Sequence, residues 1–189
     1  QQDKEIKEKI NKADPVLVRS LAPLAHYTRG AINPGVIHVW IKQLRETMDE
    51  DEICNILGLI RFFADQPDIR EQLEPVMQYL AENAEPTSQA FVHQMLLKWN
   101  RNDNNIDGIF EWASAITALN RLPGAPEESL YESHLKATLE AAEYLGDNGA
   151  VDKAIQLYSM LAAKYPMSLV ERDCLERIQL LEMNKDNAE

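Results

Sequence analysis

The chain has 189 residues, 45% of them hydrophobic, and a net charge of −12. A chain of this length can bury a sizeable core without a metal or a disulfide, and no apolar run approaches the length of a membrane span. The negative charge argues against nucleic-acid binding, because a phosphate backbone would be repelled. The acidity is compatible with solubility alone or with a basic protein or peptide partner.

The first segment, residues 1–13, is predicted to contain a short charged helix with only two apolar side chains, and we expect it to be peripheral. Asp14-Pro15 follows it and is typical of a helix start, since the aspartate can cap the helix and the proline suits its first position. Asn33-Pro34 repeats this signal. A region of helical hairpins is therefore predicted over residues 14–121.

Apolar side chains recur at helical spacing through this region, and helix starts are expected near residues 34, 51, 68, 87 and 108. The stripe of the first of these helices contains Ile37, Trp40, Leu44 and Met48. Gly58 interrupts the next helix, where we expect close packing against a neighbour to explain it. No stretch alternates with the period of a strand, so the sequence predicts an all-α protein.

Residues 122–126, LPGAP, contain two prolines and a glycine and are predicted to form a linker. A second helical region is expected over residues 127–183, with a helix over 127–145, another over 149–166 and a last one from Ser168. The polar residues 184–189 are predicted to be a disordered tail.

Residues 149–166, GAVDKAIQLYSMLAAKYP, have the features of the second helix of a hairpin. Ala154 is small enough for a neighbouring helix to come close, and Tyr158 lies one turn later on the same face, where it can fill the space between the helices. Leu161 continues this stripe. Pro166 ends the helix, because it lacks an N–H and disfavours the α conformation of the residue before it.

This spacing resembles the second half of a tetratricopeptide repeat, over about residues 135–166. The resemblance implies an α-solenoid of stacked antiparallel helical hairpins. The aromatic, Leu-Gly and Tyr positions of the first half of the repeat are replaced here by Thr138, Ala141, Ala142 and Leu145. A compact, irregular helical bundle is the rival architecture, because the hairpins share little sequence similarity with one another.

The resemblance also implies a function. Such stacks bind peptides or helices in a groove lined by the first helix of each pair, and alignment with the repeat places Lys136, Leu139 and Glu143 on that groove. We therefore expect a soluble, non-catalytic adaptor or scaffold. An inhibitor or chaperone that covers a basic partner is an alternative, in view of the negative charge.

A second alternative is a calcium-binding protein. Residues 103–108, DNNIDG, follow the first half of an EF-hand loop, with oxygen ligands offered by Asp103, Asn105, Asp107 and Glu111. Ser114 stands at the twelfth position, where a bidentate glutamate is needed. Asparagine and aspartate also cap helices and tolerate tight turns, so a plain capping loop is the competing interpretation.

The motifs of the common enzyme classes do not occur in this sequence. Its seven glycines make no phosphate-binding loop, its four histidines lack zinc-ligand spacing, and no nucleophile elbow is present. We therefore expect neither catalysis nor a cofactor other than calcium. Cys54 and Cys174 form no CxxC and are predicted to be buried, reduced thiols, which suits a cytoplasmic protein. Because the chain begins with Gln1, export after removal of a signal peptide is the alternative.

Overall fold

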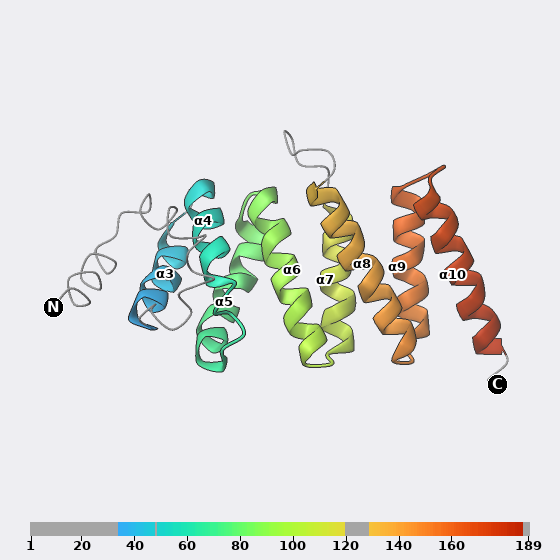
Figure 1. Ribbon diagram of the computed structural model, residues 1–189, viewed down its shortest axis with the longest axis horizontal. Coiled ribbons are helices and arrows are strands. Elements are labelled where there is room, and N and C mark those ends of the chain that lie inside the picture. Colours follow the sequence, from blue (N-terminus) through green and yellow to red (C-terminus); the bar gives the residue numbers. More distant parts are fainter. Residues whose placement is uncertain (1–33, 48, 120–128, 187–189) are drawn as a thin grey trace. The chain divides into compact units, whose positions relative to one another are not determined.

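The computed structural model describes residues 34–47, 49–119 and 129–186, and every regular element in these ranges is an α-helix (Figure 1). The helices are α3 (Pro34–Glu46), α4 (Glu50–Ile60), α5 (Pro67–Asn83), α6 (Pro86–Asn102), α7 (Ile106–Ala118), α8 (Ser129–Asp147), α9 (Val151–Lys164) and α10 (Leu169–Asp186). This confirms the predicted all-α class. The predicted peripheral helix in residues 1–13, the helix start at Asp14 and the linker at 122–126 lie outside the described residues.

The helices from α3 to α6 begin within one residue of their predicted starts. Three of them begin at a proline, which has no N–H to lose at the first helical position. Helix α4 is instead capped by Asp49, whose side chain accepts a hydrogen bond of 2.9 Å from the backbone N–H of Glu52. These starts were predictable because each depends on a few neighbouring residues.

The end of α10 differs from the prediction, because residues 184–186 are helical and are not part of a tail. Lys185 Nζ donates a hydrogen bond of 2.9 Å to Asp152 Oδ1 at the start of α9. This contact links the last turn of α10 to the neighbouring helix. The polar composition of residues 184–186 is compatible with either a helix or a disordered tail, and the hydrogen bond between Lys185 and Asp152 favours the helix.

The chain divides into two compact units, residues 1–92 and 93–189, and the division falls within α6. In the first unit, α3 packs against both α4 and α5. Its core is apolar and includes Ile37, Trp40, Leu44, Ile53, Leu57, Ile60, Phe63, Ile69, Leu73, Met77 and Leu80. The predicted close packing at Gly58 is not found among the described residues, none of which has an atom within 4 Å of a Cβ built at this position.

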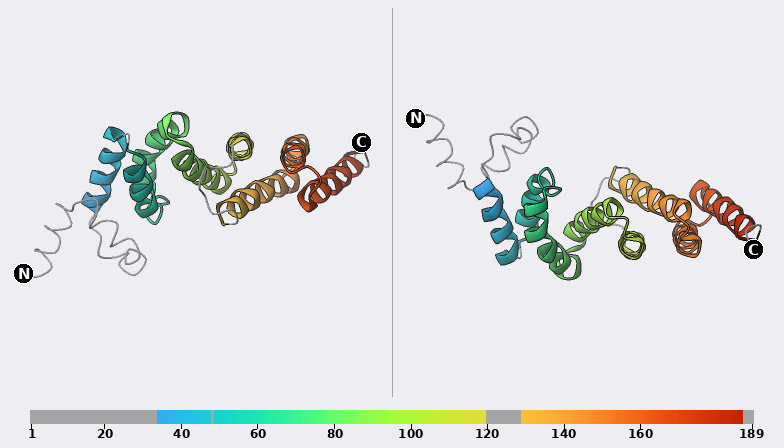
Figure 2. Two further views of the ribbon diagram at one scale, coloured as in Figure 1. Left: turned by 90° about the horizontal axis from the view of Figure 1, so that it is seen from above. Right: turned by 90° about the horizontal axis from the view of Figure 1, so that it is seen from below.

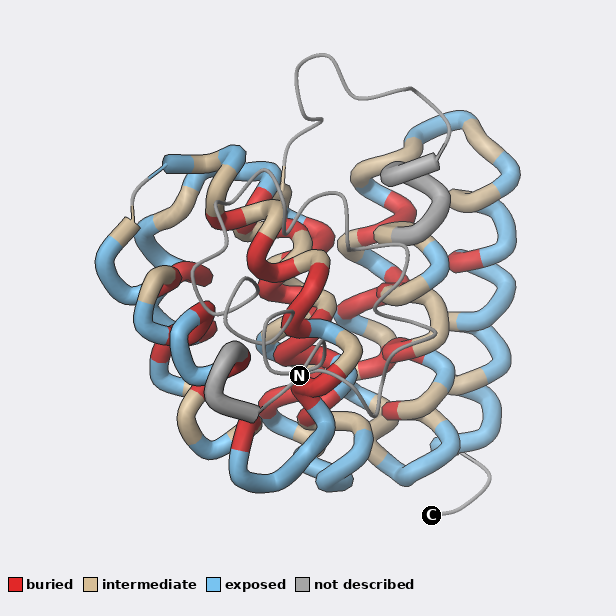
Figure 3. The backbone as a smooth tube through the Cα atoms, turned by 60° about the vertical axis from the view of Figure 1, so that its left-hand side comes forward, coloured by how far each residue is buried: buried red, intermediate tan, exposed pale blue. Residues whose placement is uncertain are grey.

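In the second unit, α8 packs against α7 and α9, and α9 also contacts α7 and α10. Figure 2 gives two further views of these helices. Buried residues are red in Figure 3. In α9 they are Ala154, Leu157, Tyr158, Leu161 and Ala162, which share one face of the helix, as an amphipathic helix requires. Ala141, Ala142 and Ala154 are completely buried, and Tyr158 is only 4% exposed. Ala154 and Tyr158, which were predicted to face the preceding helix, thus lie in the core of the second unit.

The turn between α8 and α9 explains how this hairpin closes. Gly149 has a φ of 79°, a conformation that glycine adopts without steric cost. Its N–H donates to the carbonyl of Gly146 (3.1 Å), and the N–H of Ala150 donates to the carbonyl of Leu145 (2.8 Å). These two bonds form a Schellman motif, which satisfies carbonyls at the end of α8. Helix α9 begins directly afterwards.

The turn between α6 and α7 has the same hydrogen-bond pattern with an asparagine in place of glycine. Asn104 has a φ of 54°, and its N–H donates to the carbonyl of Arg101 (3.2 Å). The N–H of Asn105 donates to the carbonyl of Asn100 (2.9 Å). The side chain of Asn105 then caps α7 by accepting a bond of 3.2 Å from the N–H of Gly108. Two successive hairpins of the second unit thus turn in the same way.

Candidate functional site

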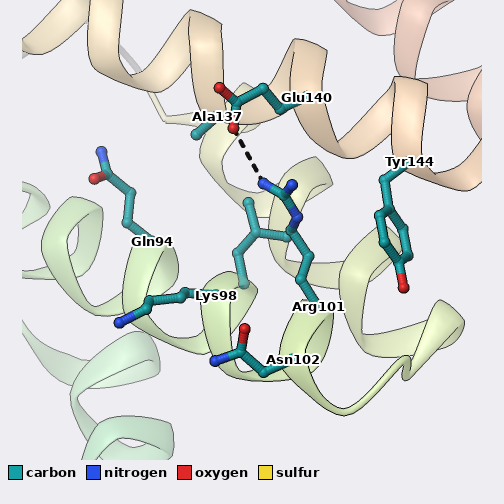
Figure 4. A pocket seen from close by; sticks show the side chains of 8 residues that line it. Gln94, Lys98, Arg101, Asn102, Ala137, Glu140 and Tyr144 are labelled. Carbon is teal, nitrogen blue, oxygen red and sulfur yellow. Dashed lines mark hydrogen bonds and ion pairs between the residues drawn. The ribbon is translucent and has the colours of Figure 1, made fainter. Parts of the chain in front are cut away.

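A groove of about 480 Å³ lies between α6 and α8, within the second unit (Figure 4). We call it the α6–α8 groove and define it by the residues that line it. Helix α6 contributes Gln94, Leu97, Lys98, Arg101 and Asn102, and helix α8 contributes Ala137, Glu140 and Tyr144. Both sets recur at intervals of three or four residues, so each helix presents one face to the groove. The volume lies in the range of roughly 300–1,000 Å³ found for ligand pockets.

The middle of the groove is occupied by an ion pair between its two walls. Arg101 donates a hydrogen bond of 3.1 Å to Glu140, as the dashed line in Figure 4 shows. Lys136, one turn before Glu140 on α8, places its ammonium 3.9 Å from the other oxygen of the same carboxylate. One carboxylate therefore interacts with two cations. Both pairs are partly exposed, so each contributes only about 0–1 kcal/mol to stability.

Tyr144 holds the guanidinium of Arg101 from a second side. The guanidinium carbon lies 5.6 Å from the centre of the Tyr144 ring, within the range of a cation–π interaction. The Tyr144 hydroxyl donates a hydrogen bond to the side-chain oxygen of Asn104 in the α6–α7 turn. The hydrogen bond to Asn104 restrains the Tyr144 ring, and the ring helps to hold Arg101 in place.

The residues predicted to bind a partner all lie on α8, and the structure places them differently with respect to the groove. Lys136 is exposed and borders the groove through its contact with Glu140. Leu139 is half-buried and packs against the core of the second unit. Glu143 is exposed and lies 3.5 Å from Arg177 of α10, outside the groove lining. The residues of α8 that line the groove are the neighbouring positions Ala137, Glu140 and Tyr144.

Sequence reasoning missed the α6 side of the groove entirely. A signal was present, because polar and charged residues recur at positions 94, 98, 101 and 102 among the apolar residues of α6. That pattern alone is equally typical of any solvated helix face. Only the neighbourhood of α6 and α8 shows which polar face takes part in a groove.

The predicted calcium loop forms a tight turn of three residues, 103–105, between α6 and α7. An EF-hand needs a loop of roughly twelve residues around the ion, whereas Asp107 and Glu111 already belong to α7. Asn105 caps α7, and Asp107 pairs with Lys153 of α9. Among the described residues, no group of three or more His, Cys, Asp or Glu side chains is arranged to hold a metal ion. The geometry favours the capping interpretation, and calorimetric titration with calcium is the direct test of the alternative.

The two thiols are free, and their surroundings do not activate them. Cys174 is buried, and burial raises its pKa to about 11. Cys54 is only partly buried, and burial likewise raises its pKa. Its sulfur lies 3.3 Å from the hydroxyl of Ser88. Both thiols are therefore protonated at neutral pH and are not poised as nucleophiles.

A polar cluster lies near the other end of α8, where Lys164 of α9 binds the end of α7. The Lys164 ammonium donates to the carbonyl of Thr117 and, at 2.6 Å, to that of Leu119. A cation suits this place because helix C-termini carry partial negative charge. His134 of α8 is half-buried, and burial, followed by the charges of Lys164 and His93, lowers its pKa. The folded second unit therefore favours the neutral imidazole.

This pKa shift predicts that acid destabilises the second unit through His134. The unfolded chain takes up a proton near the ordinary histidine pKa of about 6.5, whereas the folded chain does so only at lower pH. The stability contribution of the neutral imidazole is therefore complete above about pH 6.5 and is lost as the pH falls toward the folded pKa. We expect the urea midpoint to drop between about pH 7.5 and about pH 5.5, and to drop less in a His134→Gln variant. An equal drop in both proteins would contradict the assignment.

Comparison with models of known protein families, with curated proteins and with solved structures gave no match for this chain. Within the described ranges, no helix has both the length and the apolar character needed to cross a bilayer.

Proposed function

We propose that this protein is a non-catalytic adaptor that binds a segment of a partner protein in the α6–α8 groove. The observation that carries the proposal is the groove itself, with its volume of about 480 Å³ and walls supplied by one face each of two helices. Its lining combines aliphatic carbon from Leu97 and Ala137, one aromatic ring and several hydrogen-bonding groups. Such a mixture suits a peptide, which offers both apolar side chains and backbone amides.

The packing of the second unit supports a TPR-like arrangement of hairpins. Helix α8 contacts the helix before it and the helix after it, and α7 also contacts α9. In this arrangement α6 and α8 are the first helices of successive hairpins, α6–α7 and α8–α9. The groove then lies between the first helices of two hairpins, as in the tetratricopeptide repeat, although its lining on α8 is Ala137, Glu140 and Tyr144 and not the residues that the alignment with the repeat selects. The two hairpins also share the turn geometry described above.

Peptide selection with groove-filling variants tests the proposal. A random peptide library would be panned against the wild type and against two variants with an indole in the groove, Ala137→Trp on α8 and Asn102→Trp on α6. We expect peptides enriched by the wild type to be lost by both variants, because each indole occupies one wall of the groove. Using both walls guards against a variant that loses binding because its own helix is disturbed.

A matched control is Gln156→Trp, which adds the same side chain at an exposed position of α9 that does not line the groove. This variant should retain the selected peptides. Far-UV circular dichroism would establish that all three variants are folded. Enrichment of the same peptides by the groove-filled variants, or no enrichment by the wild type, would contradict the proposed function.

A further inference from the structure

We propose that the α6–α8 groove selects an acidic segment, and that Glu140 occupies the position of the partner's carboxylate when the groove is empty. This inference depends on the proposed function, because it names the chemistry of the ligand that the same groove binds. It also departs from the basic partner that the net charge of −12 suggests. The reason is that the charge of the groove differs in sign from the charge of the whole chain.

The groove concentrates positive charge in an acidic protein. Arg101 lines it from α6, and Lys136 borders it on α8. Glu140 is the one carboxylate among the lining residues. The local balance therefore favours an anionic ligand over a cationic one, because like charges brought together across an interface are repelled.

Glu140 interacts with these cations as an incoming carboxylate would. Its Oε2 accepts a hydrogen bond of 3.1 Å from Arg101, and its Oε1 lies 3.9 Å from the ammonium of Lys136. All three side chains are substantially exposed, at 44% for Glu140, 35% for Arg101 and 77% for Lys136. Pairs of this kind are weak, so a carboxylate of the ligand can replace Glu140 without a large loss of stability.

Arg101 is held ready for this exchange. Its guanidinium lies over the Tyr144 ring, and the Tyr144 hydroxyl is bonded to Asn104 in the α6–α7 turn. A planar guanidinium can bind a carboxylate through two parallel hydrogen bonds. Because Arg101 is already positioned, less side-chain entropy is lost when the ligand binds. The amides of Gln94 and Asn102 line the same groove and can bind the ligand backbone.

The inference is tested by removing the charge of Glu140 and measuring the affinity for an acidic and a basic peptide. The probes are two labelled synthetic peptides, one alternating glutamate with alanine and one alternating lysine with alanine, and binding is followed by fluorescence anisotropy at low salt. We expect Glu140→Gln to raise the affinity for the glutamate peptide by about threefold to tenfold, because the competing carboxylate is gone. Arg101→Gln should lower that affinity by a similar factor. The lysine peptide should bind more weakly than the glutamate peptide to the wild type.

Glu143→Gln is the matched control, since it removes the same charge from the same helix but outside the groove lining. If the inference holds, this variant binds the glutamate peptide like the wild type. If Glu140→Gln and Glu143→Gln raise the affinity for the glutamate peptide equally, the gain comes from the net charge of the protein and the inference is overturned. Preference for the lysine peptide, or no binding of the glutamate peptide, would also overturn it. If panning yields groove-dependent peptides that lack acidic residues, the adaptor function stands and only the acidic preference fails.

Discussion

Replacing Tyr158 with alanine is expected to lower the free energy of unfolding of the second unit by about 3–5 kcal/mol. Tyr158 is 4% exposed and belongs to the core cluster that also contains Ala142, Leu145 and Ala154. Removing the ring leaves a cavity beside small residues that cannot expand to fill it, so both the transfer free energy and packing contacts are lost. Urea denaturation followed by far-UV circular dichroism would measure the change.

Tyr158→Phe is the control, because it keeps the ring and removes only the hydroxyl. Burial is the main cause that raises the pKa of this phenol, so Tyr158 is uncharged at neutral pH and phenylalanine reproduces its shape. We expect this variant to stay within about 1 kcal/mol of the wild type. A loss below about 1 kcal/mol for Tyr158→Ala would show that the ring does not fill the space between α8 and α9.

The helices were predictable because their signals are local. Proline at the first position of α3, α5 and α6 and the Asp49 cap of α4 each act over a few residues. The close approach of α8 and α9 was also predictable, since Ala154 and Tyr158 stand one turn apart on one face. The surroundings of Gly58 could not be inferred, because they depend on which other helices lie nearby, and no atom of the described residues lies within 4 Å of a Cβ at this position.

The groove could be predicted only in part. The predicted binding helix, α8, does line the groove. Two of the predicted residues lie elsewhere, because Leu139 packs against the core and Glu143 pairs with α10. Glu140 and Tyr144 line the groove and were not predicted. Successive side chains on a helix point in directions about 100° apart, so an error of one residue in an alignment selects a different face of the helix. An alignment to a partial motif is too imprecise to decide which face of α8 lines the groove. The α6 residues of the groove could not be predicted from the sequence, because no local pattern indicates which helix lies beside α8.

Replacing Gly108 with alanine is expected to destabilise the α6–α7 hairpin by about 1–3 kcal/mol, although alanine is normally the better helix former. A Cβ at this position would lie 2.0 Å from Oδ1 and 2.5 Å from Cγ of Asn100. Asn100 cannot easily move, because its amide nitrogen donates to the carbonyl of Leu96 (2.8 Å) and its oxygen accepts from the side chain of Asn105 (2.7 Å). If Asn100 moves away from the new Cβ, its hydrogen bond with the Asn105 side chain breaks, and the Asn105 cap of α7 is weakened.

Gly58→Ala separates this steric effect from helix propensity, since it makes the same substitution inside α4, where no atom of the described residues lies within 4 Å of the new Cβ. There we expect a gain of about 0.5–1 kcal/mol, because alanine loses less backbone entropy on folding. Opposite signs for the two variants in urea denaturation would assign the loss at Gly108 to its contact with Asn100. A gain at both positions would mean that Asn100 can shift aside and that the turn tolerates a side chain. The hairpin would then depend on the backbone bonds around Asn104 alone.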